Sequence, residues 1–287
     1  MGPRLAAISD DLSGDFGDAA RLAAELGLSG LAVRHVGGRN ICELDRSDVA
    51  TVRRTADQYG LEISAVSSPL GRGLSLDDDP APACALLDKM IAYADVLGTN
   101  LVRFFACWIP GKEPVGDWWE RPDLTAALPR LVDRVGAFAG RAQRAGTTLM
   151  LELEGASYVG QVAEAQTLMA EVGSPSLGLC WDVCNGWWSG EHPVPRGLGL
   201  AVRLPLVDVQ FKDVHAQAGN RDRPDSTQVA LGSGDIDYAT IISTLRRNDY
   251  DGWYTAERVY HPRRPEVERP LQDAMISDLR ELSSLLT

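Results

Sequence analysis

Histidine, lysine and paired cysteines are scarce in this sequence of 287 residues. Their scarcity argues against zinc sites, disulfide frameworks and basic binding surfaces. The five cysteines are odd in number and none forms a Cys-x-x-Cys pair, which argues against a disulfide framework and a structural zinc site. Unpaired cysteines are typical of a reducing compartment. We therefore expect a cytoplasmic protein.

Excess positive charge and long apolar runs are missing as well. The formal net charge of −12 argues against nucleic acid and anionic membranes as partners, because both attract clustered Lys and Arg. No run approaches the roughly 18 apolar residues of a membrane-spanning helix, and the first residues lack the regions of a signal peptide. The remaining candidate partner is a small molecule. The helix expected near 271–286 could also pack on a neighbouring protein, either a second copy of the chain or an accessory subunit.

Short β-like runs alternate with helical stretches along the whole chain, which is the pattern of a parallel α/β fold. The expected strands lie near 4–9, 30–35, 61–67, 99–105, 147–153, 176–182, 205–211 and 252–257. The expected helices lie near 15–27, 45–59, 82–97, 121–145, 161–172, 236–248 and 267–286, with a weak one near 196–203. Glycines at 27, 60, 98 and 146 stand where helices should end. Eight repeats predict a single (β/α)8 TIM barrel as one domain over 1–287, since that fold takes about 250 residues.

The stretch Thr147–Glu154 organises the predicted site. Its leucines alternate with Met150, Glu152 and Glu154, so the leucines should face the outer helices and the two carboxylates the inside of the barrel. A carboxylate that points into a barrel is costly unless it is paired, protonated or bound to a cation. Glu152 is therefore a candidate metal ligand at the carboxyl end of a strand, where barrels of this kind build their active sites.

Three further strands in succession also end in oxygen ligands, which are Asp182, Gln210 and Glu257. Any one of them could instead cap a helix or lie in a solvated loop. Together with Glu152 they predict one divalent-metal site. Three carboxylates and an amide oxygen favour Mn²⁺, and Mg²⁺ next, over Zn²⁺.

Two long connections after strands, 106–121 and 183–195, are the expected active-site loops. They carry most of the tryptophans, among them Trp108 and Trp188, whose faces could stack on a sugar or simply pack the loops onto the rim. Arg34 and Arg103 lie near the ends of strands two and four and could bind anionic or hydroxyl groups of a substrate.

The second half of the sequence resembles the sugar phosphate isomerase/epimerase family of xylose-isomerase-like TIM barrels. The resemblance covers roughly 146–257 and lies in Gly-Thr-Thr-Leu-Met-Leu-Glu-Leu-Glu at 146–154, Leu-Gly-Leu-Cys-Trp-Asp-Val-Cys-Asn at 177–185, Val-Gln-Phe-Lys-Asp at 209–213, Leu-Gly-Ser-Gly-Asp-Ile-Asp at 231–237 and Tyr-Asp-Gly-Trp-Tyr-Thr-Ala-Glu at 250–257. It implies a divalent ion held by Glu152, Asp182, Gln210 and Glu257. Gln210 departs from the commoner His-x-Lys-Asp pattern of the family, and His215 is an alternative ligand.

The same resemblance implies roles for neighbouring residues. Glu152 and Glu257 would be both ligands and acid/base groups, and Lys212 would lie near a substrate oxygen or phosphate, unless it pairs with Asp208 or Asp213. Substrate contacts are also expected from Glu154, Asn185 and His215. Gly-Ser-Gly-Asp at 232–235 resembles a phosphate-binding turn, although a tight turn with Asp235 as N-cap is the better interpretation.

The function expected is that of a metal-dependent isomerase or epimerase of a keto-sugar or cyclic polyol. It would abstract a proton next to a carbonyl through a metal-bound enediolate. A ketose 3-epimerase in particular is disfavoured, because Tyr158 stands where the second carboxylate of that arrangement would be. Alternatives are a lyase that uses the same chemistry for β-elimination, resembling inosose dehydratases or C-glycoside-cleaving enzymes, and a non-catalytic partner subunit. Four histidines and the negative charge argue against the endonuclease branch of the superfamily, which needs a His-rich zinc site and a basic face.

Overall fold

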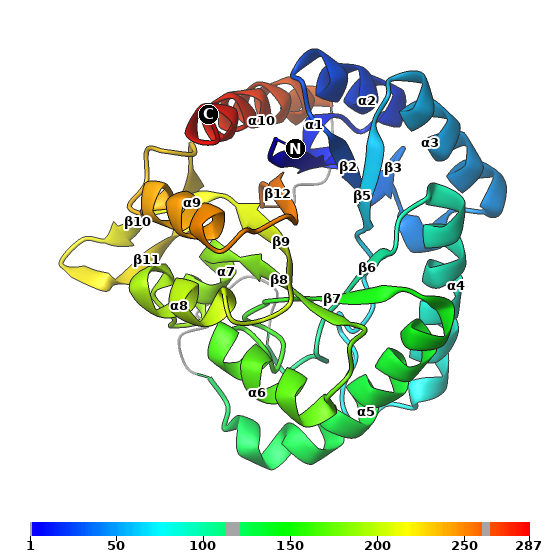
Figure 1. Cartoon of the computed structure of the whole chain (residues 1–287), viewed down its shortest axis with the longest axis vertical. Coiled ribbons are helices and arrows are strands. Elements are labelled where there is room, and N and C mark those ends of the chain that lie inside the picture. Colours follow the sequence, from blue (N-terminus) through cyan, green and yellow to red (C-terminus); the bar gives the residue numbers. More distant parts are fainter. Residues whose placement is uncertain (1, 113–120, 260–264) are drawn as a thin grey trace.

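The computed structural model describes residues 2–112, 121–259 and 265–287. Eight parallel strands close into a barrel in the order β1-β12-β9-β8-β7-β6-β5-β2 (Figure 1). They are β1 (Arg4–Ile8), β2 (Gly30–Val33), β5 (Glu62–Val66), β6 (Leu101–Phe104), β7 (Thr148–Glu152), β8 (Leu177–Asp182), β9 (Leu206–Phe211) and β12 (Trp253–Ala256). All eight lie where the sequence predicts them, which confirms the (β/α)8 TIM barrel.

The predicted helices surround this barrel (Figure 1). They are α2 (Phe16–Glu25), α3 (Arg46–Gln58), α4 (Pro80–Leu97), α5 (Leu124–Ala145), α6 (Val162–Val172), α9 (Tyr238–Arg247) and α10 (Pro265–Leu285). Aspartates open several of them, as where Asp79 accepts a hydrogen bond from the backbone N–H of Ala81. Gly98 and Gly146 end α4 and α5 in the left-handed conformation, at φ values of 70° and 68°. The weak helix is reduced to α8 (Leu198–Ala201), which follows a short segment, η2 (Pro193–Gly197), with extended backbone at Val194.

Side chains alternate along the strands as predicted. In β7, Leu149 and Leu151 belong to the large core between barrel and helices, whereas Met150 belongs to a smaller cluster inside the barrel. The other members of this inner cluster are Ala6, Ile8, Ala32, Ala65, Leu101, Cys180 and Trp253. They fill the barrel below Glu152, which therefore lies at the mouth.

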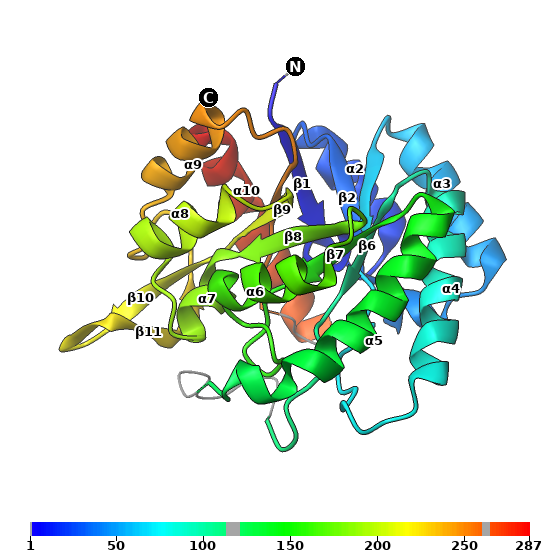
Figure 2. The same cartoon turned by 60° about the horizontal axis from the view of Figure 1, so that its bottom comes forward.

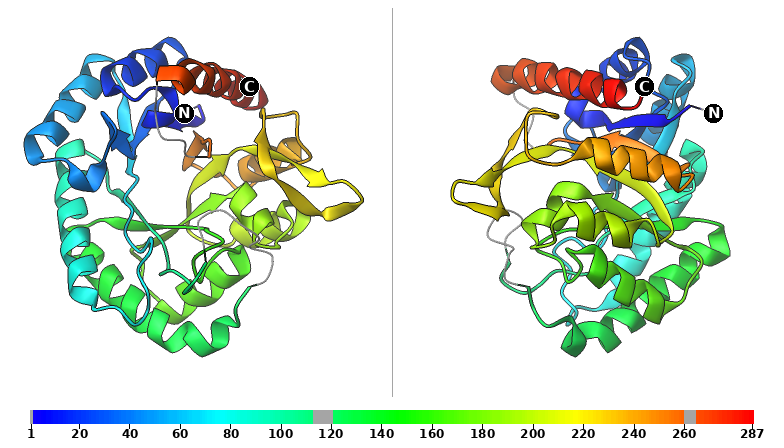
Figure 3. Two further views of the ribbon diagram at one scale, coloured as in Figure 1. Left: turned by 180° about the vertical axis from the view of Figure 1, so that it is seen from behind. Right: turned by 60° about the vertical axis from the view of Figure 1, so that its left-hand side comes forward.

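The connections at the mouth contain elements that the sequence did not predict. After β9 the chain forms an antiparallel hairpin of β10 (Asp213–Gln217) and β11 (Asn220–Val229), which projects at the end of the barrel opposite the N-terminus (Figures 2 and 3). Shorter additions are α1 (Ser9–Leu12), β3 (His35–Val36), β4 (Arg39–Asn40) and η1 (Ile41–Glu43). The loop predicted at 183–195 begins with a helix, α7 (Val183–Trp188), because the Asp182 carboxylate accepts a hydrogen bond from the N–H of Asn185 and caps it.

Residues 232–235 form the tight turn that the sequence predicts, but neither a phosphate site nor the expected cap. The Asp213 carboxylate accepts hydrogen bonds of 3.0 Å from the backbone N–H groups of Gly232 and Gly234, so these groups are not aimed at a phosphate. Helix α9 is capped by Asp237 rather than by Asp235. In the loop predicted at 106–121, residues 113–120 lie outside the described residues. None of the described helices is long and apolar enough to cross a membrane.

Candidate metal centre

Three carboxylates converge at the mouth of the barrel. Glu152 ends β7, Asp182 ends β8, and Glu257 directly follows β12. All three are buried, and one ligand oxygen of each lies within 4.8 Å of the others. Among the described residues this is the one cluster of His, Cys, Asp and Glu side chains that could hold a metal ion. The closed barrel produces it, since parallel strands bring their carboxyl ends to the same rim.

Gln210, the fourth predicted ligand, is fully buried beside this cluster. One end of its amide is 3.2 Å from oxygens of both Asp182 and Glu257, and the other end is 3.3 Å from Glu152 Oε2. With the amide oxygen toward Asp182 and Glu257, the four side chains offer oxygen ligands, the type that a hard divalent cation takes. With the amide rotated, its N–H₂ group donates to the same two carboxylates. The residues present therefore fit the metal, and the amide also has a partner without one.

Three basic side chains contact the acidic cluster, and all three were predicted as substrate-binding residues. Lys212 forms ion pairs with Asp182 and, at 3.1 Å, with Glu257. Arg34 donates to Glu257 Oε1 at 3.1 Å, and Arg103 donates to Glu152 Oε2 at 3.0 Å. Lys212 thus pairs with the cluster rather than with the aspartates near it in sequence. These contacts offset much of the negative charge, so the site needs less compensation from a cation.

Burial and the basic side chains act in opposite directions on the carboxyl groups. Burial raises the pKa of Asp182 to about 8, although Lys212 opposes the shift. Burial also acts to raise the pKa of Glu257, but Lys212 and Arg34 hold it below its ordinary value. Glu257 is therefore ionised at neutral pH. Burial raises the pKa of Asp182 although this carboxylate is ion-paired with Lys212, and opposed shifts of this kind are typical of sites that move protons.

Sequence reasoning missed Asp10 and Asp11, which hold Arg34 in place. The Arg34 guanidinium is 3.0 Å from Asp10 and 2.5 Å from Asp11, and all three side chains are buried. Burial raises the pKa of Asp11 to about 6; it acts in the same direction on Asp10, but Arg34 and His35 hold the Asp10 pKa below its ordinary value. The available signal was a pair of adjacent aspartates directly after the first strand.

Three other predicted substrate-binding residues, Glu154, Trp188 and Trp108, have different surroundings. Glu154 is buried, and burial raises its pKa to about 7. Trp188 has its ring centroid 5.8 Å from Lys212 Nζ, and its indole N–H donates to the carbonyl of Asp225 in β11. The indole N–H of Trp108 donates to the carbonyl of Lys112, which ties the described part of that loop together.

Asn185 contacts the end of β7, and His215 is not part of the carboxylate cluster. The Asn185 amide N–H₂ group donates to the carbonyl of Leu153 at 2.7 Å and so joins α7 to the end of β7. His215 is half exposed on hairpin strand β10, where its ring lies 3.5 Å from Asp235. It is not a member of the carboxylate cluster, so the structure does not place it as the alternative metal ligand.

A closed parallel barrel with a buried acidic cluster at its mouth defines a TIM barrel protein with a candidate metal centre. The family model described as "Xylose isomerase-like TIM barrel" matches residues 20–280, so the chain belongs to that family. The family resemblance noted from the sequence is thereby confirmed. No curated protein matches the sequence significantly.

Several solved structures share this fold. A probable 3-DHS dehydratase (AsbF) of Bacillus anthracis is 19% identical, with a TM-score of 0.73 and 99% of each chain covered. A D-psicose 3-epimerase in the presence of D-fructose is 16% identical, with a TM-score of 0.70 and coverage of 98% of this chain and 97% of that one. A xylose isomerase-like TIM barrel protein of Mycobacterium smegmatis in complex with magnesium is 17% identical, with a TM-score of 0.69 and coverage of 100% and 96%. At these identities the likeness establishes the fold alone.

Proposed function

We propose that the protein is a divalent-metal-dependent enzyme that isomerises or epimerises a keto-sugar or cyclic polyol by removing a proton next to a carbonyl. The observation that carries this proposal is the buried set of Glu152, Asp182 and Glu257 with the Gln210 amide beside it. Oxygen donors of this kind suit Mn²⁺ or Mg²⁺. The fold neighbours that bind magnesium or act on a ketose support the proposal.

The residues divide the chemistry between them. A bound divalent ion would polarise the substrate carbonyl and stabilise the negative charge that develops beside it. Glu257, kept ionised by Lys212 and Arg34, is suited to accept the proton from carbon. Glu152 comes from a strand that is not adjacent to β12 and is suited to return a proton on the other face. Lys212 can donate hydrogen bonds to a substrate oxygen when it exchanges one of its carboxylate partners.

β-Elimination is the second candidate, and Glu154 favours it. This buried carboxyl group, with its pKa of about 7, is half protonated near neutral pH and could give its proton to a departing hydroxyl group. Tyr158, where a ketose 3-epimerase would need a carboxylate, also weighs against that particular epimerisation. One fold neighbour is described as a probable dehydratase.

The metal content of protein purified without chelator tests the site. We expect about one divalent ion, Mn²⁺ first, per chain in the wild type and its loss in Glu152→Gln, because the neutral amide removes one charged ligand. An exposed change such as Asp273→Asn is the matched control and should retain the ion. Metal-free wild type that added Mn²⁺ does not stabilise against heat would contradict the proposal and favour a non-catalytic subunit.

Turnover of keto-sugars in deuterated water tests the chemistry. Glu257→Gln should reduce kcat at least tenfold with the fold intact, since an amide cannot accept the proton. Deuterium in a recovered sugar would identify isomerisation or epimerisation, and release of water would identify elimination. A Glu257→Gln protein that keeps more than about a tenth of the wild-type kcat would exclude Glu257 as the base.

A further inference from the structure

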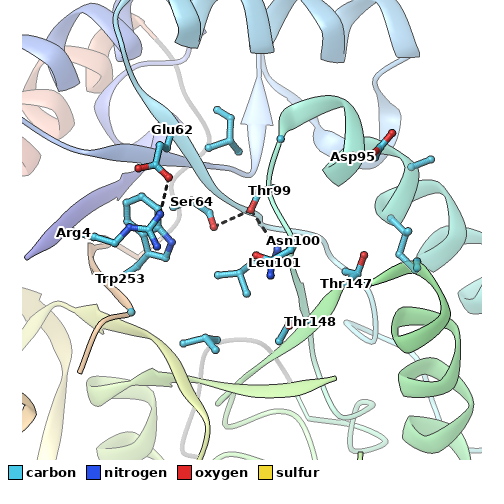
Figure 4. Close-up of a pocket in the computed structure, with 18 of the residues that line it drawn as sticks. Arg4, Glu62, Ser64, Asp95, Thr99, Asn100, Leu101, Thr147, Thr148 and Trp253 are labelled. Atoms are coloured by element: carbon cyan, nitrogen blue, oxygen red, sulfur yellow. Dashed lines mark hydrogen bonds and ion pairs between the residues drawn. The ribbon is translucent and has the colours of Figure 1, made fainter. Parts of the chain in front are cut away.

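Strand β12 leads directly into Glu257, and its two ends are held by different kinds of contact. At the start, the Arg4 guanidinium lies 3.8 Å from the centroid of the Trp253 ring and pairs with the Glu62 carboxylate at 2.6 Å (Figure 4). At the other end, the N–H of Glu257 still donates to the carbonyl of Phe211 in β9, but the N–H groups of the next two residues donate to side chains. The position of Glu257 therefore depends on contacts from outside the barrel sheet.

Gln228, near the end of hairpin strand β11, holds the backbone at Glu257. Its amide oxygen accepts a hydrogen bond of 2.8 Å from the N–H of Val259, and its N–H₂ group donates to the carbonyl of Glu257 at 3.3 Å. One backbone partner is a donor and the other is an acceptor, so an amide side chain satisfies both, whereas a carboxylate or an apolar side chain does not. Gln228 thus continues the backbone hydrogen bonding beyond the end of the sheet.

Asp11 holds the same segment from the side of β1. One of its oxygens accepts a hydrogen bond of 2.9 Å from the N–H of Arg258, and the other accepts one of 2.5 Å from the Arg34 guanidinium. Arg34 in turn donates to Glu257 Oε1 at 3.1 Å, while Lys212 donates to Glu257 Oε2 at 3.1 Å. The backbone around Arg258 is therefore held from two sides, and the Glu257 carboxylate reaches both basic side chains at once.

The hairpin that carries Gln228 is itself held against α7. The indole N–H groups of Trp187 and Trp188 donate to the carbonyls of Asp222 and Asp225 in β11, at 3.1 and 2.7 Å. Helix α7 directly follows β8, and β9 lies between β8 and β12 in the barrel. Strand β11 therefore connects the carboxyl end of β8 with that of β12, and both of these strands lead into a carboxylate of the cluster.

We propose that hairpin β10–β11 is a positioning element of the metal centre and that Gln228 is its positioning residue. Glu257 has an oxygen within 4.8 Å of ligand oxygens of Glu152 and Asp182, so a shift of its backbone would move it relative to both. Partners that orient a ligand typically change metal affinity by 10–100-fold when they are removed. This inference rests on the proposed function for the role of Glu257 as ligand and base.

The Mn²⁺ affinity of Gln228→Met tests this role, because methionine has a similar length but neither donates to nor accepts from the two backbone groups. We expect the affinity, measured by competition with a fluorescent chelator, to fall about tenfold. Gln217→Met, at the exposed far end of the same hairpin, is the matched control and should keep the wild-type affinity.

A double-mutant cycle in chelator-treated protein separates positioning from plain structural support. If Gln228 acts through the Glu257 side chain, Gln228→Met should destabilise the Glu257→Gln protein less than it destabilises the wild type in urea denaturation. Additive losses would overturn the proposal, as would an unchanged Mn²⁺ affinity in Gln228→Met when the wild type binds the ion. Wild-type protein that binds no Mn²⁺ would contradict the proposed function instead, and the cycle would still decide on Gln228.

Discussion

Gln210 reaches all three carboxylates of the cluster through the two ends of its amide. In one orientation it adds an oxygen ligand, and in the other it donates hydrogen bonds to Asp182 and Glu257. A histidine at this position, the commoner residue in the family pattern, would offer nitrogen instead. In the proposed metal site the glutamine would keep the ligand set hard, and without an ion its amide contacts the carboxylates of the cluster.

Replacing Gln210 should change which metal ion binds. In Gln210→His we expect affinity for Zn²⁺ to rise on the order of tenfold or more and preference for Mg²⁺ to fall, because imidazole is the softer ligand. Competition with a fluorescent chelator measures both affinities. Gln210→Leu, which removes both the amide oxygen and the N–H₂ group, is the control and should weaken the binding of every ion. Equal Zn²⁺ affinity in wild type and Gln210→His would show that this position is not a ligand.

At the scale of elements, one carboxylate organises the connection between β9 and α9. Asp213 accepts hydrogen bonds from the backbone N–H groups of Val214, Gly232 and Gly234. A Cβ atom on Gly234 would come within 2.2 Å of an Asp213 oxygen, so the turn and the carboxylate fit closely. Since Lys212 directly precedes Asp213, the same turn fixes the start of the segment that follows the metal centre.

Asp213→Asn should therefore destabilise the protein. The asparagine N–H₂ group would face backbone donors, and leaving one of them unsatisfied costs about 1–3 kcal/mol of unfolding free energy. Urea denaturation measures the loss. Asp273→Asn, on the exposed face of α10, is the matched control and should change stability by less than about 0.5 kcal/mol. Equal stability of the two variants would show that the turn does not depend on the Asp213 charge.

The elements that the sequence predicts are those with a strong local pattern. β7 has alternating leucines, and α4 has Asp79 at its start and Gly98 at its end. Hairpin β10–β11 is mostly exposed and polar, so it has no apolar alternation to reveal it. Helix α7 depends on capping by Asp182, a residue first interpreted as a ligand.

The residues of the site divide in the same way, into those that a local sequence pattern predicts and those whose contacts join distant parts of the chain. Each carboxylate could be predicted because it ends its own strand. The contacts of Arg34 with Asp10, Asp11 and Glu257 could not, because these residues follow β2, β1 and β12, and β12 comes beside β1 only when the barrel closes. The orientation of the Asn185 amide likewise depends on its distance to a carbonyl of another strand.

For the whole molecule, buried carboxyl groups connect stability to pH. Burial raises the pKa of Asp208 to about 8, against an ordinary value of 3.8. Between these values the folded protein holds protons that the unfolded chain has released, and a state with more bound protons loses stability as pH rises. Asp10 and Glu257, whose pKa values are lowered, lose their contribution only at more acidic pH. Metal-free protein should thus be less stable at pH 8 than at pH 5.5.

Asp208→Asn should flatten this dependence. Asparagine keeps an acceptor for the Thr255 hydroxyl, which donates to Asp208 at 2.7 Å, but it binds no proton. We expect the fall in unfolding free energy between pH 5.5 and 8 to shrink by up to about 1.4 kcal/mol per pH unit. Urea denaturation at both pH values, with chelator present, measures it. Parallel pH profiles for the two proteins would show that Asp208 is ionised in the fold.

Strand β12 pairs with both β1 and β9, and it is the last strand of the barrel to be synthesised. Glu257, which pairs with Arg34 and Lys212 at the rim, directly follows this strand. A nascent chain that stalls before Trp253 therefore has two open sheet edges, which promote aggregation and proteolysis. Closure of the barrel and arrival of the last carboxylate of the rim depend on the same short stretch of chain, so a truncated product lacks both.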